Sequence, residues 1–508
     1  MPTQTSNNKR IAKNTLMLYI RMLVTMGIAL FTSRVILQTL GVEDYGIYSV
    51  VGSVVSMFTF LNGGMIASTQ RFLTFELGRN NDQQLAKVFS SALQIHTLLA
   101  LVVVVASESI GLWFLYEKMI IPEGRFNAAF WVFQFSIIGC VINIMIVPFN
   151  ADIVAHEKMS AFAYISVIEV TLKLLVVYLL CLSPFDKLIV YAALLLLVQL
   201  LISCIYIRYC GKNFQETKYR HTVDYSLLKE MSSFAGWGFF GSLATLLYTQ
   251  GLNLLLNVFF GAVVNAARGI AVQVQSAVTG FVSNFQMALN PQITKNYATG
   301  NLPQMHSLMF RSARFSFFLL FLLTLPIILE TKYILTLWLG VMPPEAIIFT
   351  QWILALSLLY PLSNPCVIAN QATGKVKNYQ MVVGGLLLSV VPVSYIVLLL
   401  GAPAYAVFVV NFCIECIALF SRMYMLRNLI NLPFIQYLKN TIYPVIVVAI
   451  LSSIAPLYVH YLVVDDIERL LGVCLTSLLS ISTIVFLFGL TKHERQLILT
   501  KLKSFKAR

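Results

Sequence analysis

Long apolar runs follow one another along the whole chain, separated by short polar connections, and this pattern restricts the folds open to it. A run of roughly 20 apolar residues crosses a bilayer as an α-helix, in which the backbone groups find their partners within the segment. Hydrophobic residues make up 58% of the 508 residues and charged residues only 11%, which excludes a soluble globular protein. The runs also lack the strict alternation that a transmembrane β-barrel requires. The sequence therefore predicts an all-α polytopic membrane protein.

The apolar runs and their polar breaks predict about fourteen transmembrane helices. The first is expected over residues 14–40, the second over 46–72 and the eighth over 263–290. The 35 lysine and arginine residues concentrate in alternate connections, which places those connections and both termini in the cytoplasm. Because the basic residues are spread over many loops, the formal net charge of +14 does not indicate a nucleic-acid partner.

The two halves of the chain share a weak internal repeat. Identical residues recur at spacings of 220 to 222 positions: Asn62 and Asn284, Gln70 and Gln292, Gly78 and Gly300, Gly41 and Gly261, Phe89 and Phe310, and Ala92 and Ala313. An even number of predicted helices separates the two copies, so both have the same orientation in the membrane. The repeat therefore predicts two parallel six-helix lobes around a central cavity, with an appended helix pair.

These predictions divide the chain into four parts. An N-terminal six-helix lobe is expected over residues 1–209 and a C-terminal six-helix lobe over 231–428. The cytoplasmic linker between them, 210–230, is too short to bury a core of its own. Residues 429–508 are expected to form two extra helices and a basic cytoplasmic tail.

The first predicted helix carries two arginines, Arg21 and Arg34. An arginine at the centre of a bilayer costs roughly 3 kcal/mol, so two in one helix indicate a wet, protein-lined cavity that suits an anionic substrate. Snorkelling of the two side chains toward opposite membrane surfaces explains the pattern equally well.

A third intramembrane arginine, Arg268, lies in the eighth predicted helix. The planar guanidinium matches phosphate oxygens, so convergent arginines suit a pyrophosphate group. Polar residues of the same helix and the one before it are candidates for binding sugar hydroxyls, or else they bond neighbouring helices to one another. The candidates for the glycan are Asn253, Asn257, Gln273 and Asn284.

Two acids inside predicted helices are candidates for coupling transport to a proton or a sodium ion. Glu169 lies four residues before Lys173 and therefore on the same helix face, where a mutual ion pair is expected. Glu415 has no obvious basic partner nearby in the sequence.

The sequence contains no recognisable catalytic or cofactor motif. It has no Walker loop, no G-x-S-x-G and no metal-spaced set among its six histidines and eight cysteines. Cys413 and Cys416 form a C-x-x-C inside a predicted helix, without a second pair, which is typical of buried packing. We therefore expect no enzyme activity, no cofactor and no metal.

The segment from Thr32 to Tyr48 carries a short pattern: an arginine late in the first helix, Leu-Gly, polar residues, and an aromatic-Gly-aliphatic-Tyr opening of the second helix. Leu40, Gly41, Tyr45, Gly46 and Tyr48 fit this pattern. In it the chain resembles the polysaccharide transporter branch of the multidrug/oligosaccharidyl-lipid/polysaccharide (MOP) exporter superfamily, which includes O-antigen flippases. Helix number, two lobes and basic loops extend the resemblance over essentially the whole chain.

The resemblance implies a flippase of the bacterial cytoplasmic membrane. Its substrate would be an undecaprenyl-pyrophosphate-linked oligosaccharide, translocated by alternating access for O-antigen or capsule synthesis, and its partners would include membrane lipids and polysaccharide polymerase machinery. Related lipid II flippases use cavity arginines in helices one and eight, to which Arg34 and Arg268 correspond, with Arg21 as a further candidate.

Two alternatives remain open at this point. A multidrug or cation exporter of the same superfamily would favour acidic cavity residues, whereas the first helix has arginines and no acid. A polytopic glycan polymerase or acyltransferase commonly keeps a large extracytoplasmic loop, whereas the outer connections here are short.

Overall fold

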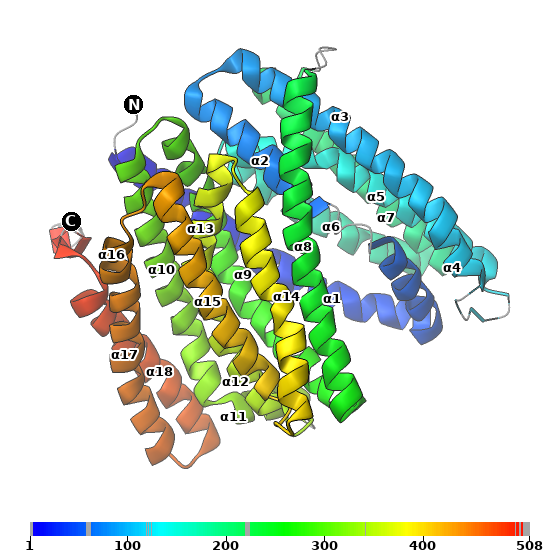
Figure 1. Ribbon diagram of the computed structural model, residues 1–508. Helices are drawn as coiled ribbons and strands as arrows, with labels where there is room; N and C mark the ends of the chain where they lie inside the picture. The colour runs from blue at the N-terminus through cyan, green and yellow to red at the C-terminus, as the bar shows by residue number, and fades with distance from the viewer. Residues whose placement is uncertain are drawn as a thin grey trace. The chain divides into compact units, whose positions relative to one another are not determined.

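The computed structural model describes residues 4–56, 62–117, 119, 121–122, 124–218, 224–340, 342–492, 494–496 and 499–500. Throughout these residues the regular structure is helical, as Figure 1 shows. The all-α prediction is therefore confirmed.

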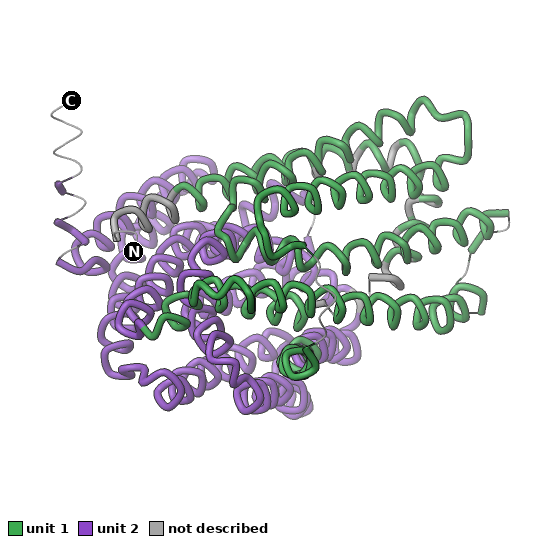
Figure 2. The backbone as a smooth tube through the Cα atoms, turned by 90° about the horizontal axis from the view of Figure 1, so that it is seen from above, with its two compact units in different colours: residues 1–243, 294–300 green, residues 244–293, 301–508 purple. Residues whose placement is uncertain are grey.

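The chain groups into two compact units, coloured separately in Figure 2. Unit 1 comprises residues 1–243 and 294–300, and unit 2 comprises 244–293 and 301–508. Two long helices, α8 (Tyr225–Phe260) and α9 (Ala262–Ala298), contribute residues to both units.

The other elements of unit 1 precede α8 in the chain. They are α1 (Gln4–Ser56), α2 (Asn62–Arg79), α3 (Asp82–Ala106), η2 (Ser107–Gly111), α4 (Leu112–Glu117), α5 (Phe126–Ala155), α6 (Met159–Leu182), α7 (Lys187–Asn213) and η3 (Gln215–Thr217). Helix α5 packs mainly against α7, and α1 packs mainly against α6. Buried apolar residues of α1, α3, α5 and α7, among them Val51, Val103 and Phe133, form one core.

The other elements of unit 2 follow α9. They are α10 (Leu302–Leu329), α11 (Thr331–Leu339), α12 (Ala346–Ser357), α13 (Tyr360–Thr373), α14 (Lys377–Leu399), α15 (Ala406–Ile430), α16 (Phe434–Tyr437), η4 (Leu438–Ile442), α17 (Tyr443–Leu462), α18 (Asp466–Ile484) and η5 (Val485–Gly489). Phe349 of α12 and Phe408 of α15 pack edge to face in one of its apolar cores, with ring centroids 4.8 Å apart. Helices α17 and α18 pack against each other.

Eleven helical segments of the described residues are long and apolar enough to cross a membrane. They are α3 to α4, α5, α6, α7, α8, α10, α12 to α13, α14, α15, α16 to α17, and α18 with η5. The predicted spans 14–40, 46–72 and 263–290 are not among these eleven, and they correspond to α1, α2 and α9. The chain is thus a multi-pass membrane protein.

Gly41 explains the Leu-Gly of the family pattern. Helix α1 bends at this residue, whose φ of 79° and ψ of 169° lie in a region that is essentially restricted to glycine. The bend separates the two helices expected over 14–40 and 46–72. Gly261 lies between α8 and α9 with a φ of 83°, so the repeat pairs two glycines with equivalent backbone roles.

The turns that lead into α3 and α10 are also alike. Asn81 caps α3 by accepting a hydrogen bond from the Gln84 amide, and Asn301 caps α10 by accepting one from the Gln304 amide. Each capping asparagine follows a residue of positive φ. The two capping asparagines are 220 residues apart, and so are the two residues of positive φ that precede them. The structural repeat therefore includes positions beyond the six identical pairs found in the sequence.

Arg125, the residue before α5, joins three connections of unit 1. Its Nε donates to Asp44 Oδ1 at 2.9 Å, its Nη2 also pairs with Asp44, and its Nη1 donates to Asp186 Oδ2 at 2.5 Å. Asp186 in turn caps α7 by accepting from the amides of Leu188 and Ile189. Asp44 is one of the polar residues of the family pattern, so part of that pattern serves to fix these helix ends.

Candidate functional site

Arg268 lies in the first turns of α9, where α8 holds its guanidinium. One terminal nitrogen donates to the side-chain oxygen of Asn253, and the other donates to the Thr249 carbonyl at 3.3 Å. Asn253 also donates to Gln250 Oε1 at 3.0 Å. The structure therefore brings together Arg268 and Asn253, two of the predicted substrate-binding residues.

One donor of Arg268 is left for a ligand. Its Nε is buried and has no hydrogen-bond partner among the described residues. A buried guanidinium donor without a partner is costly, and a phosphate oxygen is the kind of acceptor that would satisfy it. Gly261 permits the close α8–α9 connection that places this arginine beside α8.

Glu415 has a basic partner, contrary to the prediction. Arg422, two helical turns further along α15, donates to Glu415 Oε2 at 3.1 Å and to Ser363 Oγ at 3.1 Å. Both Glu415 and Arg422 interact electrostatically with Tyr248 of α8, which also interacts with Arg268. The prediction missed this pair because it considered only nearer neighbours, whereas residues seven apart also share a helix face.

The three other predicted glycan residues do not join this cluster. Asn257 and Gln273 are exposed on α8 and α9. Asn284 is buried, and its amide donates to the carbonyl of Gly280 one turn earlier in α9.

In unit 1 a second charged cluster lies where α1 packs on α6. The guanidinium of Arg21 stacks over the Phe162 ring, 4.7 Å from its centroid, and interacts electrostatically with Glu169 and Tyr206. Lys173 donates to Glu169 at 2.6 Å, so the predicted ion pair is confirmed. Two predicted site residues, Arg21 and Glu169, are thus neighbours. The side chain of Arg34 lies outside the described residues.

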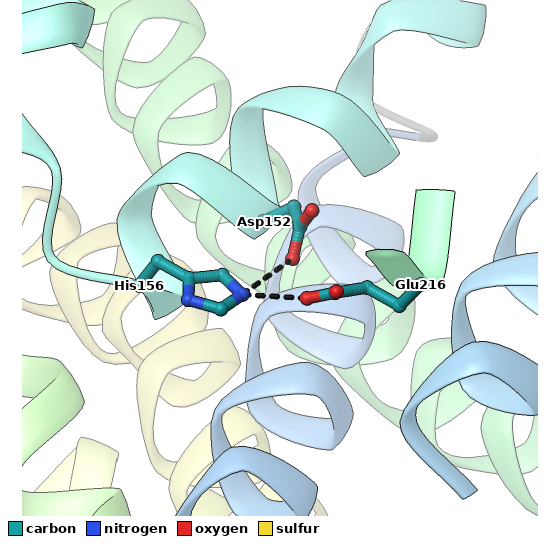
Figure 3. Close-up of side chains that lie close together, drawn as sticks. All are labelled: Asp152, His156 and Glu216. Atoms are coloured by element: carbon teal, nitrogen blue, oxygen red, sulfur yellow. Dashed lines mark hydrogen bonds and ion pairs between the residues drawn. The ribbon is translucent and has the colours of Figure 1, made fainter. Parts of the chain in front are cut away.

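The sequence analysis missed one cluster of possible metal ligands. Asp152 and His156 at the end of α5 meet Glu216 of η3, as Figure 3 shows, and their ligand atoms all lie within 4.8 Å of one another. The i, i+4 spacing of Asp152 and His156 was the available sequence signal. Glu216 lies 60 positions further on, and no sequence signal linked it to Asp152 or His156.

Hydrogen bonding decides the charge state of Glu216. Burial is the largest single influence and would raise the pKa of its carboxyl, but the hydrogen bond with His156, 2.5 Å from its Oε1, together with a backbone hydrogen bond and smaller electrostatic contributions outweighs burial, so the pKa lies below its usual value. The carboxylate form is therefore favoured.

The polysaccharide biosynthesis protein family matches residues 11–297, more than half of the chain. The chain belongs to this family. The match covers the Leu-Gly pattern, the Arg125 contacts and the α8–α9 turn with Arg268. No curated protein sequence matches the chain significantly.

Solved structures with a similar fold include two that are described as transporters. An outward-facing multidrug resistance MATE family transporter of the MOP superfamily is 14% identical, with a TM-score of 0.72 over 84% of this chain and 96% of its own. A MATE structure in a bent conformation gives the same values. A MOP superfamily transporter from Pyrococcus furiosus, described by a reversed polarity of its binding pocket, is 13% identical, with a TM-score of 0.66 over 83% of this chain and 96% of its own. This family member therefore has a MATE-like fold.

Proposed function

We propose that this chain is a flippase of the bacterial cytoplasmic membrane. It would translocate an undecaprenyl-pyrophosphate-linked oligosaccharide to the outer leaflet for the synthesis of a surface polysaccharide such as O-antigen or capsule. Membership of the polysaccharide biosynthesis family carries this proposal, supported by the MATE-like fold. Polysaccharide polymerase machinery would then receive the translocated glycan.

The pyrophosphate would bind at intramembrane arginines. Arg268 supports this role because Asn253 and Thr249 orient its guanidinium while its buried Nε keeps a free donor. Arg34 and Arg21 of α1 are proposed to bind the same group from the other half of the chain. Exposed Asn257 and Gln273, together with Asn253 and Asn284, would bind sugar hydroxyls.

Alternating access would follow from two parallel six-helix lobes, 1–209 and 231–428, around a central cavity. In this proposal 210–230 is the cytoplasmic linker, and 429–508 adds two helices and a tail, giving about fourteen transmembrane helices with both termini in the cytoplasm. The equivalent glycines Gly41 and Gly261 and the equivalent caps Asn81 and Asn301 support the repeat.

Glu169 and Glu415 would couple transport to a proton or a sodium ion. Each is paired with a cation, Lys173 and Arg422 respectively. Protonating either carboxylate would release its partner, so the charge inside the helix bundle would change during the cycle.

The test is translocation of a short fluorescent undecaprenyl-pyrophosphate glycan in proteoliposomes. Wild type should move the lipid, and Arg268→Gln should reduce the rate at least about tenfold, which corresponds to roughly 1.4 kcal/mol of lost interaction. The matched control is Arg427→Gln, which removes an exposed arginine of α15 and should leave the rate unchanged. Normal translocation by Arg268→Gln would refute the pyrophosphate role of this residue.

A multidrug or cation exporter is the second candidate, because the similar solved structures include a multidrug resistance transporter. The buried Arg268, whose Nε keeps a free donor, argues against it, since cation export favours acidic rather than basic residues in the substrate cavity. Drug resistance of an overexpressing strain, with no glycolipid translocation in proteoliposomes, would favour the exporter.

A further inference from the structure

Three side chains that the transport mechanism does not use converge at one end of α5. His156 Nε2 lies 2.5 Å from Glu216 Oε1 and 3.7 Å from Asp152 Oδ1 (Figure 3). All three side chains belong to unit 1. A nitrogen and two carboxylate oxygens thus face a single point.

Asp152 is the decisive residue of this cluster. It is 0% exposed, and neither of its carboxylate oxygens accepts a hydrogen bond from any described residue. A buried carboxylate without hydrogen bonds is strongly unfavourable unless a positive charge compensates it. Its aim toward His156 and Glu216 shows where that charge would be.

Protein side chains do not supply enough compensating charge. Within the described part of the chain, the ion pairs of Asp152 and Glu216 are with His156 only, and none is with lysine or arginine. With both carboxyls ionised, a protonated imidazole leaves one negative charge buried, so the cluster must take up either a further proton or a cation. A divalent cation bound by two carboxylates and a neutral imidazole leaves none.

The cluster is also held rigidly. Asp152 lies in the last turn of α5 and His156, four positions on, is the C-cap residue of this helix, so both face the same side. The His156 ring stacks on Phe214, with centroids 4.1 Å apart and planes 9° apart, which fixes the imidazole orientation. Glu216 is only 7% exposed, on the short η3 turn that follows Phe214. Such preorganisation is typical of metal sites.

We propose that Asp152, His156 and Glu216 bind one divalent transition-metal ion, for which Zn²⁺ is the best match. Zinc takes imidazole nitrogen and carboxylate oxygen ligands at roughly 2.0–2.2 Å in a tetrahedron, which sets ligand atoms about 3.4 Å apart. The separations of His156 Nε2 from Glu216 Oε1, 2.5 Å, and from Asp152 Oδ1, 3.7 Å, lie on either side of that value. A water molecule would complete the four ligands.

The ion would connect the end of α5 to the linker that leads into the second half of the chain. Glu216 lies in that linker, whereas Asp152 belongs to the candidate transmembrane helix α5 and His156 is the C-cap residue of that helix. The site would thus have a structural role, separate from substrate binding.

The test uses tag-free, full-length protein in detergent, stripped with a chelator and titrated with Zn²⁺ by calorimetry. Wild type should bind one ion per chain and melt at a higher temperature with Zn²⁺. Co²⁺ in its place should show the visible absorption of a tetrahedral site. His156→Ala and Glu216→Gln should each weaken binding by at least about tenfold.

His306→Gln is the matched control, because His306 is a partly buried histidine that bonds the Ile430 carbonyl in unit 2. It should bind Zn²⁺ like wild type. Glu216→Gln changes a short connector, so it also covers the case in which His156→Ala fails to fold. Absence of stoichiometric Zn²⁺ binding by wild type, or equal affinity in Glu216→Gln and wild type, would overturn the proposal.

Discussion

Replacing Arg125 by glutamine tests whether the family pattern stabilises unit 1. The arginine bridges Asp44, which follows the bend of α1, and Asp186, the cap of α7. Glutamine keeps much of the side-chain length but loses the charge and the planar fork that contacts both carboxylates.

The loss of unfolding free energy expected for Arg125→Gln lies between two limits. An exposed ion pair contributes roughly 0.2–1 kcal/mol. A hydrogen bond to a charged group contributes roughly 1.5–3 kcal/mol. The side chains of Arg125, Asp44 and Asp186 are 26%, 18% and 32% exposed, so solvent screens the contacts only in part. We expect Arg125→Gln to lower the free energy of unfolding by about 2 kcal/mol.

The effect should depend on pH in a defined direction. Burial would raise the pKa of Asp186, but the hydrogen bond from Arg125 and those from the α7 amides outweigh it, so the pKa lies below its usual value. Hydrogen bonding to Asp44 raises the pKa of Arg125, which stays charged. A lowered carboxyl pKa stabilises the fold above the unfolded value of about 3.9 and loses this effect as pH falls through the folded value.

Thermal unfolding in detergent, measured from neutral pH down to about pH 3, checks this reasoning. The difference between wild type and Arg125→Gln should be constant near neutral pH and shrink below about pH 4. Lys187→Gln, which removes a neighbouring exposed charge, is the control and should change little. Equal melting of Arg125→Gln and wild type at neutral pH would refute the argument.

Three further predictions concern packing, capping and charge. A Cβ at Gly64 would lie 2.4 Å from the Ala235 carbonyl oxygen, so Gly64→Val should destabilise unit 1 by at least about 1–3 kcal/mol. A variant that melts at the wild-type temperature would show that α2 and α8 are not in close contact. Asn301→Ala should cost about 1 kcal/mol through the lost α10 cap, and an unchanged denaturation midpoint would argue against it. Arg422→Met should lower the free energy of unfolding by about 3 kcal/mol, because it leaves Glu415 unpaired. Adding Glu415→Gln should recover part of that loss. Equal stability of the single and double variants would contradict the pairing.

Some features could be predicted from the sequence because they depend only on the spacing of nearby residues. Glu169 and Lys173 are four residues apart, so any helix brings them together, and the structure confirms their ion pair. Gly41 and Gly261 were found by comparing the chain with itself, and both adopt a positive φ at a helix junction. Such features depend on the helix alone and do not require knowledge of which helices are neighbours.

Contacts between distant residues were not readable in the same way. Arg125 is 81 positions from Asp44 and 61 from Asp186, and Glu216 is 60 positions from His156. An apolar run shows that a helix crosses the membrane but does not show which neighbours its polar face meets. These residues therefore looked like ordinary loop charges.

The sequence by itself determined the all-α membrane class, the resemblance to polysaccharide exporters and the presence of arginines within apolar runs. Long apolar runs fold as membrane-spanning helices, and charged residues inside them are easily recognised. Only the tertiary structure decided that Asn253 orients Arg268, that Arg422 neutralises Glu415 and that three ligand atoms meet beside His156. The physical reason is that side-chain chemistry depends on distances of a few ångströms between helices, and helix packing sets those distances.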